Sequence, residues 1–184
     1  GRCGVALLED LSDASLGRIV RAVGAARRPG DVAVVSLHWG GNWDFDVPQA
    51  QRAFARALIE MAGVDVVHGH SSHHVKGIEV HRGRPILYGC GDFLDDYEGI
   101  GGYGAFRGEL GAMYFVTLDA ADGRLLALDL VPTRIHRFRI GHARGADRRW
   151  LLRTLQRECG RFGCEVRDAG ERGFALGWGA GAGA

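Results

Sequence analysis

The residues with the clearest chemical potential lie in one short stretch, HGHSSHH, at positions 68–74. This stretch holds four of the eight histidines of the chain, and it follows directly on the apolar pair Val66 and Val67. Neutral imidazole is the commonest nitrogen ligand for zinc, manganese and iron in proteins. The stretch is therefore either a metal-binding loop at the end of a strand or a polar turn that is rich in imidazole.

A further histidine, His38, stands in a similar setting. It follows the run DVAVVSL at 31–37 and opens the loop HWGGNW at 38–43. A first-row metal ion needs three or more ligands at about 2.0–2.2 Å. We expect His38, His70 and His73 to be the metal ligands, because their loops can converge if the two preceding strands are neighbours. The structural alternative is a buried imidazole at position 38 and turn residues at positions 70 and 73.

The other polar residues of these loops are expected to support the ligands. Gly69 would let the backbone turn sharply and aim His70 toward the neighbouring strand. His68 is expected to orient the loop, and His74 to lie at the surface or beside a ligand. Three roles are open for Asp92: it could bind metal, orient an imidazole or form a turn. The second and third roles together are favoured over metal binding. The residues expected to bind substrate or to support the ligands are Trp39, Asn42, His68, His74 and Asp92.

The segments before both loops indicate parallel strands joined by a helix. Residues 31–37 and 64–67 are short, β-branched runs, which are typical of strands buried on both faces. Between them, residues 48–63 carry apolar side chains at helical spacing and end in glycine. A strand, a helix and a strand in this order form a right-handed βαβ unit. Both histidine loops would then leave the carboxyl ends of neighbouring parallel strands, where α/β proteins place their sites.

The remainder of the chain is predicted to be one helix before this unit and mainly antiparallel strands after it. The first helix begins at Ser12 or Asp13 and ends near Arg28. Strands are expected at 75–81, 85–88, 113–118, 125–131 and 135–140, a long loop at 94–111, and a helix at 147–159. One domain is expected over residues 1–170, and the Gly- and Ala-rich tail 171–184 is expected to be disordered.

Composition and charge exclude several classes of function. The net charge is +1, and 22 arginines and a single lysine are mixed with acidic residues, so no nucleic-acid partner is expected. The four cysteines form no CxxC pair, which disfavours a zinc ribbon. No apolar run approaches the about 20 residues that cross a bilayer, and no signal segment is present. The location therefore defaults to the cytoplasm, but the start without Met indicates a fragment, and a missing N-terminus could bring membrane association.

Four segments follow one another in an informative order and spacing. They are VVSLHWG at 34–40, VDVVHGHSSH at 64–73, IEV at 78–80 and GRPILYGCGDF at 83–93. Together they resemble the C-terminal half of the CapA family, bacterial capsule or poly-γ-glutamate biosynthesis proteins with a calcineurin-like metallophosphoesterase fold. The resemblance covers about residues 31–140.

The resemblance implies an α/β fold, the C-terminal half of a four-layer αββα sandwich. It also implies a site for two divalent metal ions, such as Mn, Fe or Zn. His38, His70 and His73 match the late ligand motifs of the family, and the other ligands would lie upstream of residue 1. His70 and His73 would then also be the catalytic residues.

Three positions depart from the family pattern. Ser72 replaces the usual proline, Asn42 stands where many members carry Glu, and Asp92 replaces the Asn of the late family motif. The change at position 92 adds a carboxylate near the expected metal pocket. It would assist a ligand or alter the choice of substrate.

Two functions follow from the resemblance. The first is a metal-dependent hydrolase of the phosphoesterase type, which acts on a phosphoester or an anionic polymer and is active only with the upstream half of its domain. The second is a non-catalytic component that binds a polyanion within a membrane-associated polymer synthesis complex. A small zinc module complete in itself is disfavoured, because three histidines leave a metal ion under-coordinated.

Overall fold

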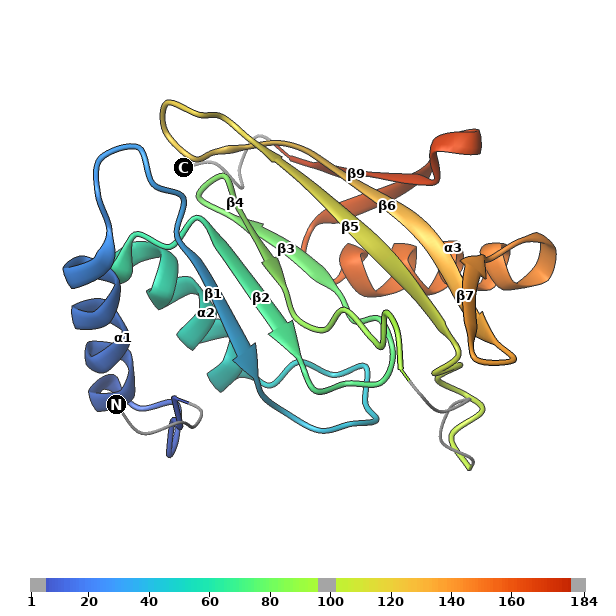
Figure 1. Ribbon diagram of the computed structural model, residues 1–184, viewed down its shortest axis with the longest axis horizontal. Helices are drawn as coiled ribbons and strands as arrows, with labels where there is room; N and C mark the ends of the chain where they lie inside the picture. Colours follow the sequence, from blue (N-terminus) through green and yellow to red (C-terminus); the bar gives the residue numbers. More distant parts are fainter. Residues whose placement is uncertain (1–5, 96–101, 180–184) are drawn as a thin grey trace.

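The computed structural model describes residues 6–95 and 102–179, which form three α-helices and two sheets (Figure 1). The protein is a mixed α/β structure and a partial α/β sandwich, as the sequence predicts. No helix in these two segments is long and apolar enough to cross a membrane.

The elements follow one another in two groups. The helices are α1 (Asp13–Ala26), α2 (Gln49–Ala62) and α3 (Gly145–Gly160), and a 3-10 turn spans Gly170–Arg172. The first sheet has the order β1-β2-β4-β3 and consists of β1 (Val34–His38), β2 (Val66–His70), β3 (Ile78–His81) and β4 (Arg84–Leu87). The second has the order β5-β6-β9-β8, with β7 paired to β6, and consists of β5 (Leu110–Leu118), β6 (Leu125–His136), β7 (Arg139–His142), β8 (Cys164–Asp168) and β9 (Phe174–Trp178).

The first two helices begin and end at the residues that the sequence indicates. At α1, the Ser12 hydroxyl accepts a hydrogen bond from the backbone N–H of Ser15 at 3.4 Å, which satisfies a free donor of the first turn. At the end of α2, Gly63 adopts a left-handed conformation with φ of 65° and stops the helix. The two helices cover one face of the first sheet, and their contact with it forms one apolar core (Figure 1).

Strands β1 and β2 are parallel, which confirms the predicted strand–helix–strand unit. Their register pairs Val34 with Val66 and, four residues later, His38 with His70. The loops that follow the two strands therefore leave the same edge of the sheet side by side (Figure 1).

The prediction that β1 is buried on both faces is wrong. Leu37 is 8% exposed and packs in the core beneath α1 and α2, but Val34 is 58% exposed and Ser36 and His38 are also exposed. The reason is that β1 is the edge strand of its sheet, and no described element covers its second face. An apolar run in the sequence does not distinguish a central strand from an edge strand.

A second apolar core joins β3 and β4 to the second sheet and to α3. Within that sheet, β6 runs without a break from Leu125 to His136, where two strands at 125–131 and 135–140 were predicted. Pro132 falls between the stretch of β6 that pairs with β9 and the stretch that pairs with β7. A proline is tolerated there, because its missing N–H lies where the pairing changes from one partner strand to the next.

The prediction of a disordered tail at 171–184 is also wrong for most of the residues that the structure describes there. Phe174 is fully buried and Leu176 is 7% exposed, and β9 pairs with both β6 and β8. The domain therefore extends past residue 170, because the apolar side chains of β9 complete the second core. Residues 180–184 of the expected tail lie outside the described residues.

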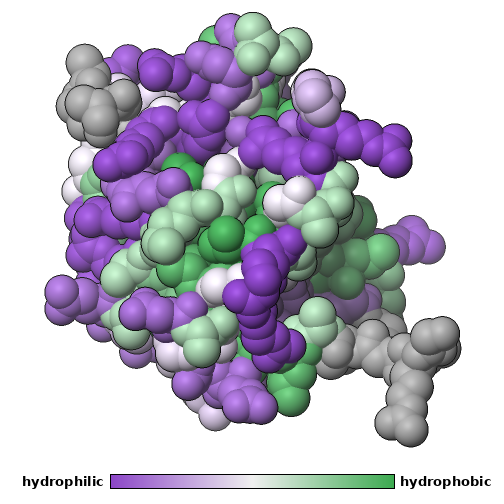
Figure 2. Space-filling model, turned by 90° about the vertical axis from the view of Figure 1, so that its left-hand side faces the viewer, coloured by the Kyte–Doolittle hydropathy of each residue, from purple (hydrophilic) through white to green (hydrophobic). Residues whose placement is uncertain are grey.

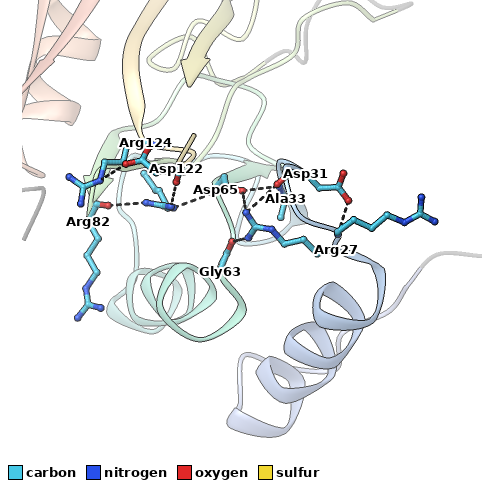
Figure 3. A network of polar contacts seen from close by, with 10 residues as sticks. Arg27, Asp31, Ala33, Gly63, Asp65, Arg82, Asp122 and Arg124 are labelled. Carbon is cyan, nitrogen blue, oxygen red and sulfur yellow. Dashed lines mark hydrogen bonds and ion pairs between the residues drawn. The ribbon is translucent and has the colours of Figure 1, made fainter. Parts of the chain in front are cut away.

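A buried carboxylate connects three parts of the fold (Figure 3). Asp65, which is fully buried, accepts hydrogen bonds from the guanidinium of Arg27 at 2.8 Å and from the N–H of Ala33 at 2.9 Å. Its second oxygen accepts a bond from Arg84 at 3.3 Å, and Arg84 also donates to the carbonyl of Asp122 at 2.6 Å. The end of α1, the entry to β1 and the β5–β6 turn are thus held against the start of β2.

We predict that Asp65→Ala lowers the free energy of unfolding by about 2–3 kcal/mol, because it leaves two guanidinium groups and a backbone N–H without their acceptor. Asp31→Ala is the matched control, since the exposed carboxylate of Asp31 accepts the N–H of Arg28, and a loss below about 0.5 kcal/mol is expected. Equilibrium urea denaturation measures both. Equal losses in the two variants would contradict the role given to Asp65.

Candidate functional site

The parallel register places His38 and His70 side by side. The two residues are paired across β1 and β2, and their ring centroids lie 5.2 Å apart in an edge-to-face arrangement. Alternate residues of a strand face the same side of a sheet, so both imidazoles lie on the open face of β1 and β2. His38 is exposed and His70 is half-buried, which leaves both rings accessible.

His68 belongs to the same row of side chains, two residues before His70. Its ring lies 5.5 Å from that of His70, and its Nδ1 is hydrogen-bonded to the Ser36 hydroxyl at 2.9 Å. The sequence predicts that His68 orients the loop, whereas the structure places it within β2, where it ties β2 to β1. Ser36 was missed, although its position two residues before His38 and opposite His68 becomes evident once the register is known.

Two histidines of this row, His68 and His70, have a pKa below the usual value of an imidazole. Burial lowers the pKa of His68. Burial also lowers the pKa of His70, and the neighbouring His68 and His38 lower it further. Neutral imidazole is the form that binds a metal ion, so the lowered pKa of His70 favours metal binding there.

Gly69 has a different role from the sharp turn that the sequence suggests. It lies within β2, where a Cβ atom would come within 2.5 Å of the Trp39 indole nitrogen and 2.7 Å of the carbonyl oxygens of Leu87 and Tyr88. Trp39, expected to bind substrate or support a ligand, donates from this indole nitrogen to the Tyr88 carbonyl at 3.2 Å. Only glycine admits this close approach, so Gly69 fixes Trp39 beneath the histidine row.

The sharp change of direction comes instead at Ser71, whose φ is 119°. Its hydroxyl contacts the carbonyl of Gly40 at 3.3 Å and the side-chain oxygen of Asn42 at 3.4 Å. The N–H of His73 then donates to the carbonyl of Asn42 at 3.1 Å. Asn42 therefore joins the two histidine loops, which agrees with a supporting role.

His73 is paired with Asp92. The Nδ1 atom of His73 lies 2.8 Å from a carboxylate oxygen of Asp92, and both side chains are about one-fifth exposed. Gly91, with φ of 71°, packs against the backbone of His74, and Gly111 approaches the Asp92 carbonyl so closely that a Cβ would lie 2.8 Å from it. A carboxylate held in this way at one ring nitrogen orients the imidazole, as carboxylates do for histidines that bind metal ions.

His74 lies in the interior and not at the surface. Its Nε2 accepts the N–H of Asp44 at 3.2 Å, and its Nδ1 donates to the carbonyl of Val75 at 3.0 Å. Burial lowers the pKa of His74 to about 4, against a smaller rise from the hydrogen bond to Val75. Since both nitrogens are occupied, His74 supports the loop and is not a metal ligand.

An aromatic wall beside His73 was not predicted. The Trp43 ring lies 5.2 Å from that of His73 and stacks on Tyr103 at 4.3 Å with an angle of 4° between the planes. Phe106 contacts both Trp43 and the buried His74. The only signal in the sequence is the aromatic content of the loops at 38–45 and 102–106, which does not reveal that they meet.

The structure thus brings the predicted ligands together only in part. His38 and His70 form one pair, and His73 with Asp92 forms another. Within residues 6–95 and 102–179, no group of three or more His, Cys, Asp or Glu side chains is arranged to hold a metal ion. The donor atoms suit a first-row metal ion, but the described part of the chain offers an incomplete set.

Comparisons with known proteins find one family model and several relatives. The family model described as "Bacterial capsule synthesis protein PGA_cap" matches residues 4–97, which include both histidine loops and Asp92. The chain is 49% identical over 166 residues to the probable polyglutamine synthesis accessory protein of Mycobacterium tuberculosis (strain ATCC 25618 / H37Rv), and the match covers 90% of the chain and 43% of that protein.

Two further relatives come from Bacillus. The chain is 39% identical over 74 residues to the PGA biosynthesis protein CapA of Bacillus subtilis (strain 168), which covers 40% of the chain and 19% of that protein. It is 32% identical over 84 residues to the capsule biosynthesis protein CapA of Bacillus anthracis, which covers 46% of the chain and 20% of that protein.

The chain spans less than half the length of the mycobacterial relative. The region that the family model matches is slightly more than half of the chain, and it contains β1, β2 and every residue of the site apart from the aromatic side chains at 103 and 106. The chain therefore belongs to the bacterial capsule synthesis protein family, PGA_cap.

Proposed function

We propose that the full-length protein is a metal-dependent hydrolase of the phosphoesterase type that acts in the synthesis of a capsule or of a glutamate polymer, and that this chain contributes the histidine half of its site. The observation that carries the proposal is the pairing of His38 with His70 at the carboxyl ends of two parallel strands. The relatives named for polyglutamine synthesis, PGA biosynthesis and capsule biosynthesis support the biological setting.

Each residue has a distinct role in this proposal. His38 and His70 hold metal, and so does His73, whose imidazole Asp92 orients through Nδ1. When bound, two divalent ions of Mn, Fe or Zn supply Lewis acidity and lower the pKa of a water molecule to near neutrality. His70 and His73 are the catalytic residues of this proposal, and a neighbouring imidazole that binds no metal would protonate the leaving group.

The remaining ligands are proposed to come from the upstream half of the same domain. A cleft of about 600 Å³ lies between the sheets and is lined mainly by apolar residues of β1, β2, β4 and β5. Val34 and Phe115 are 58% and 51% exposed, and β1 and β5 are edge strands of their sheets within the described residues. On the side shown in Figure 2, hydrophobic side chains gather in a hollow between hydrophilic ones.

An exposed apolar surface beside an unpaired strand edge is typical of a site where another polypeptide segment packs. His68 lines the cleft together with Val34 and Val66, so a segment that fills the cleft would reach the histidine row. The greater length of the mycobacterial relative is consistent with such a segment. These features support an upstream half that covers the cleft and completes the ligand set.

We predict that the full-length protein binds two equivalents of a divalent metal ion, measured by inductively coupled plasma mass spectrometry. His38→Ala and His70→Ala should each lower the bound metal by about one equivalent or more, because each removes a ligand. His142→Ala, at an exposed histidine of β7, is the control and should keep both equivalents. A full-length protein that binds no metal would refute the catalytic proposal.

We predict that the isolated chain of 184 residues binds metal weakly and does not turn over substrate, because its ligand set is incomplete. Hydrolysis of p-nitrophenyl phosphodiesters and of γ-glutamyl peptides, with added Mn²⁺, measures this. Turnover by the isolated chain would show that the site is complete without the upstream half.

We predict that Val34→Glu and Phe115→Glu weaken the binding of a separately produced upstream half by about tenfold or more, because each places a charge in the apolar cleft. Met61→Glu, at a 64% exposed position of α2, is the control and should change binding by less than about twofold. Isothermal titration calorimetry gives the dissociation constants. Unchanged binding in both cleft variants would place the upstream half elsewhere.

A further inference from the structure

The hairpin formed by β6 and β7 carries an unbalanced positive charge. Residues 134–144, RIHRFRIGHAR, contain four arginines and two histidines and no acidic residue. Two of these residues, Arg137 and Phe138, form the turn, and His136 pairs with Arg139 across it. The function proposed above gives this hairpin no role.

Three of the four arginines have no acidic partner within the described residues. Arg137, Arg139 and Arg144 are exposed, and no ion pair joins any of them to a carboxylate there. Arg134 differs, because it donates to Asp147 at 2.7 Å and helps to fix the start of α3. The three exposed guanidinium groups are therefore available to an external anion.

The two residues at the tip of the hairpin are not glycine, although their backbone conformation favours glycine. Arg137 and Phe138 have φ values of 51° and 57°, both in the left-handed region. Two-residue turns of this kind are most favourable with Asn-Gly, since other residues are strained there. Phe138 is nevertheless 65% exposed, so burial in the core does not account for an arginine and a phenylalanine at this tip. A binding role accounts for Arg137, whose exposed guanidinium has no acidic partner within the described residues.

The base of the hairpin lies beside the histidine site. A Cβ on Gly111 would meet both the Asp92 carbonyl at 2.8 Å and the Thr133 hydroxyl at 3.4 Å, so β6 passes next to the residue that orients His73. Thr133 pairs with His142, and the tip lies four residues further on, about 13 Å away for an extended strand. The turn between β6 and β7 lies at the lower right in Figure 1, on the side to which the loops after β1 and β2 also extend.

We propose that this hairpin binds an anionic polymer with regularly repeated carboxylates, of the poly-γ-glutamate type, and holds it next to His73 and Asp92. The proposal rests on the proposed function, to which it adds a binding site for the polymer. The guanidinium group matches a carboxylate with two parallel hydrogen bonds, and three such groups along one hairpin suit a chain of carboxylates better than a single small anion. A membrane surface is less suited, since interfacial binding relies on a wide apolar face and the hairpin tip offers one aromatic side chain.

The test measures binding of the full-length protein to poly-γ-glutamate in the presence of EDTA, by fluorescence anisotropy of the labelled polymer. The triple variant Arg137→Ala, Arg139→Ala, Arg144→Ala should weaken binding about tenfold or more, and wild-type binding should weaken as salt rises. The matched control replaces Arg18, Arg21 and Arg28 with Ala. These arginines are exposed on and after α1, and the control should change binding less than about twofold.

A second variant separates binding from folding. Arg137→Asn with Phe138→Gly gives the turn its most favourable sequence, so the melting temperature should stay the same or rise. Polymer binding should nonetheless fall, because the tip loses its guanidinium group and its aromatic ring. A variant that binds the polymer as tightly as the wild type would overturn the role of the tip.

Two other results would overturn the proposal. One is an equal loss of binding in the hairpin and α1 triple variants, which would mean that only the overall charge matters. The other is hairpin-dependent binding to vesicles of phosphatidylglycerol and phosphatidylcholine without binding to the polymer. Because polymer binding is measured in EDTA, it does not depend on bound metal, so the hairpin proposal and the hydrolase proposal can fail separately.

Discussion

The parallel pairing of β1 with β2 is the constraint on which the rest of the site depends. Its register sets His38 opposite His70 and Ser36 opposite His68, so four polar side chains line one face at the carboxyl ends of the strands. A shift of the register by one residue would turn one of the two rows to the opposite face and separate the imidazoles. The buried carboxylate of Asp65 secures this register, because it ties the entry to β1 to the start of β2.

The histidines of the site differ in burial and in hydrogen bonding, and these differences set their chemical roles. On β1 and β2, His68 lines the cleft and His38 is exposed, whereas His74 is enclosed with both ring nitrogens occupied. His73 lies between these extremes, with one nitrogen held by Asp92 and Trp43 against its ring. The five histidines at and just after the ends of β1 and β2 thus divide into candidate ligands at 38, 70 and 73 and supporting residues at 68 and 74.

The sequence was informative where local physics decides the outcome. Ser12, Gly63 and the valine runs predict the ends of α1 and α2 and the parallel pair, because capping and apolar periodicity are local properties. It misled where the answer depends on distant neighbours. An edge position exposes Val34, a close approach by Trp39 explains Gly69, and pairing with β6 and β8 gives the supposed tail its order. The Trp43–Tyr103 stack was missed for the same reason, since its members are far apart in sequence.

The central claim is that His38 and His70 are two ligands of one metal ion in the complete protein. A crystal structure of the full-length protein grown with Mn²⁺, with anomalous diffraction recorded near the manganese edge, tests it directly. The account predicts an anomalous peak within about 2.0–2.3 Å of one nitrogen of each of these two imidazoles. A fully occupied manganese ion bound elsewhere, with both imidazoles free of metal, would contradict it.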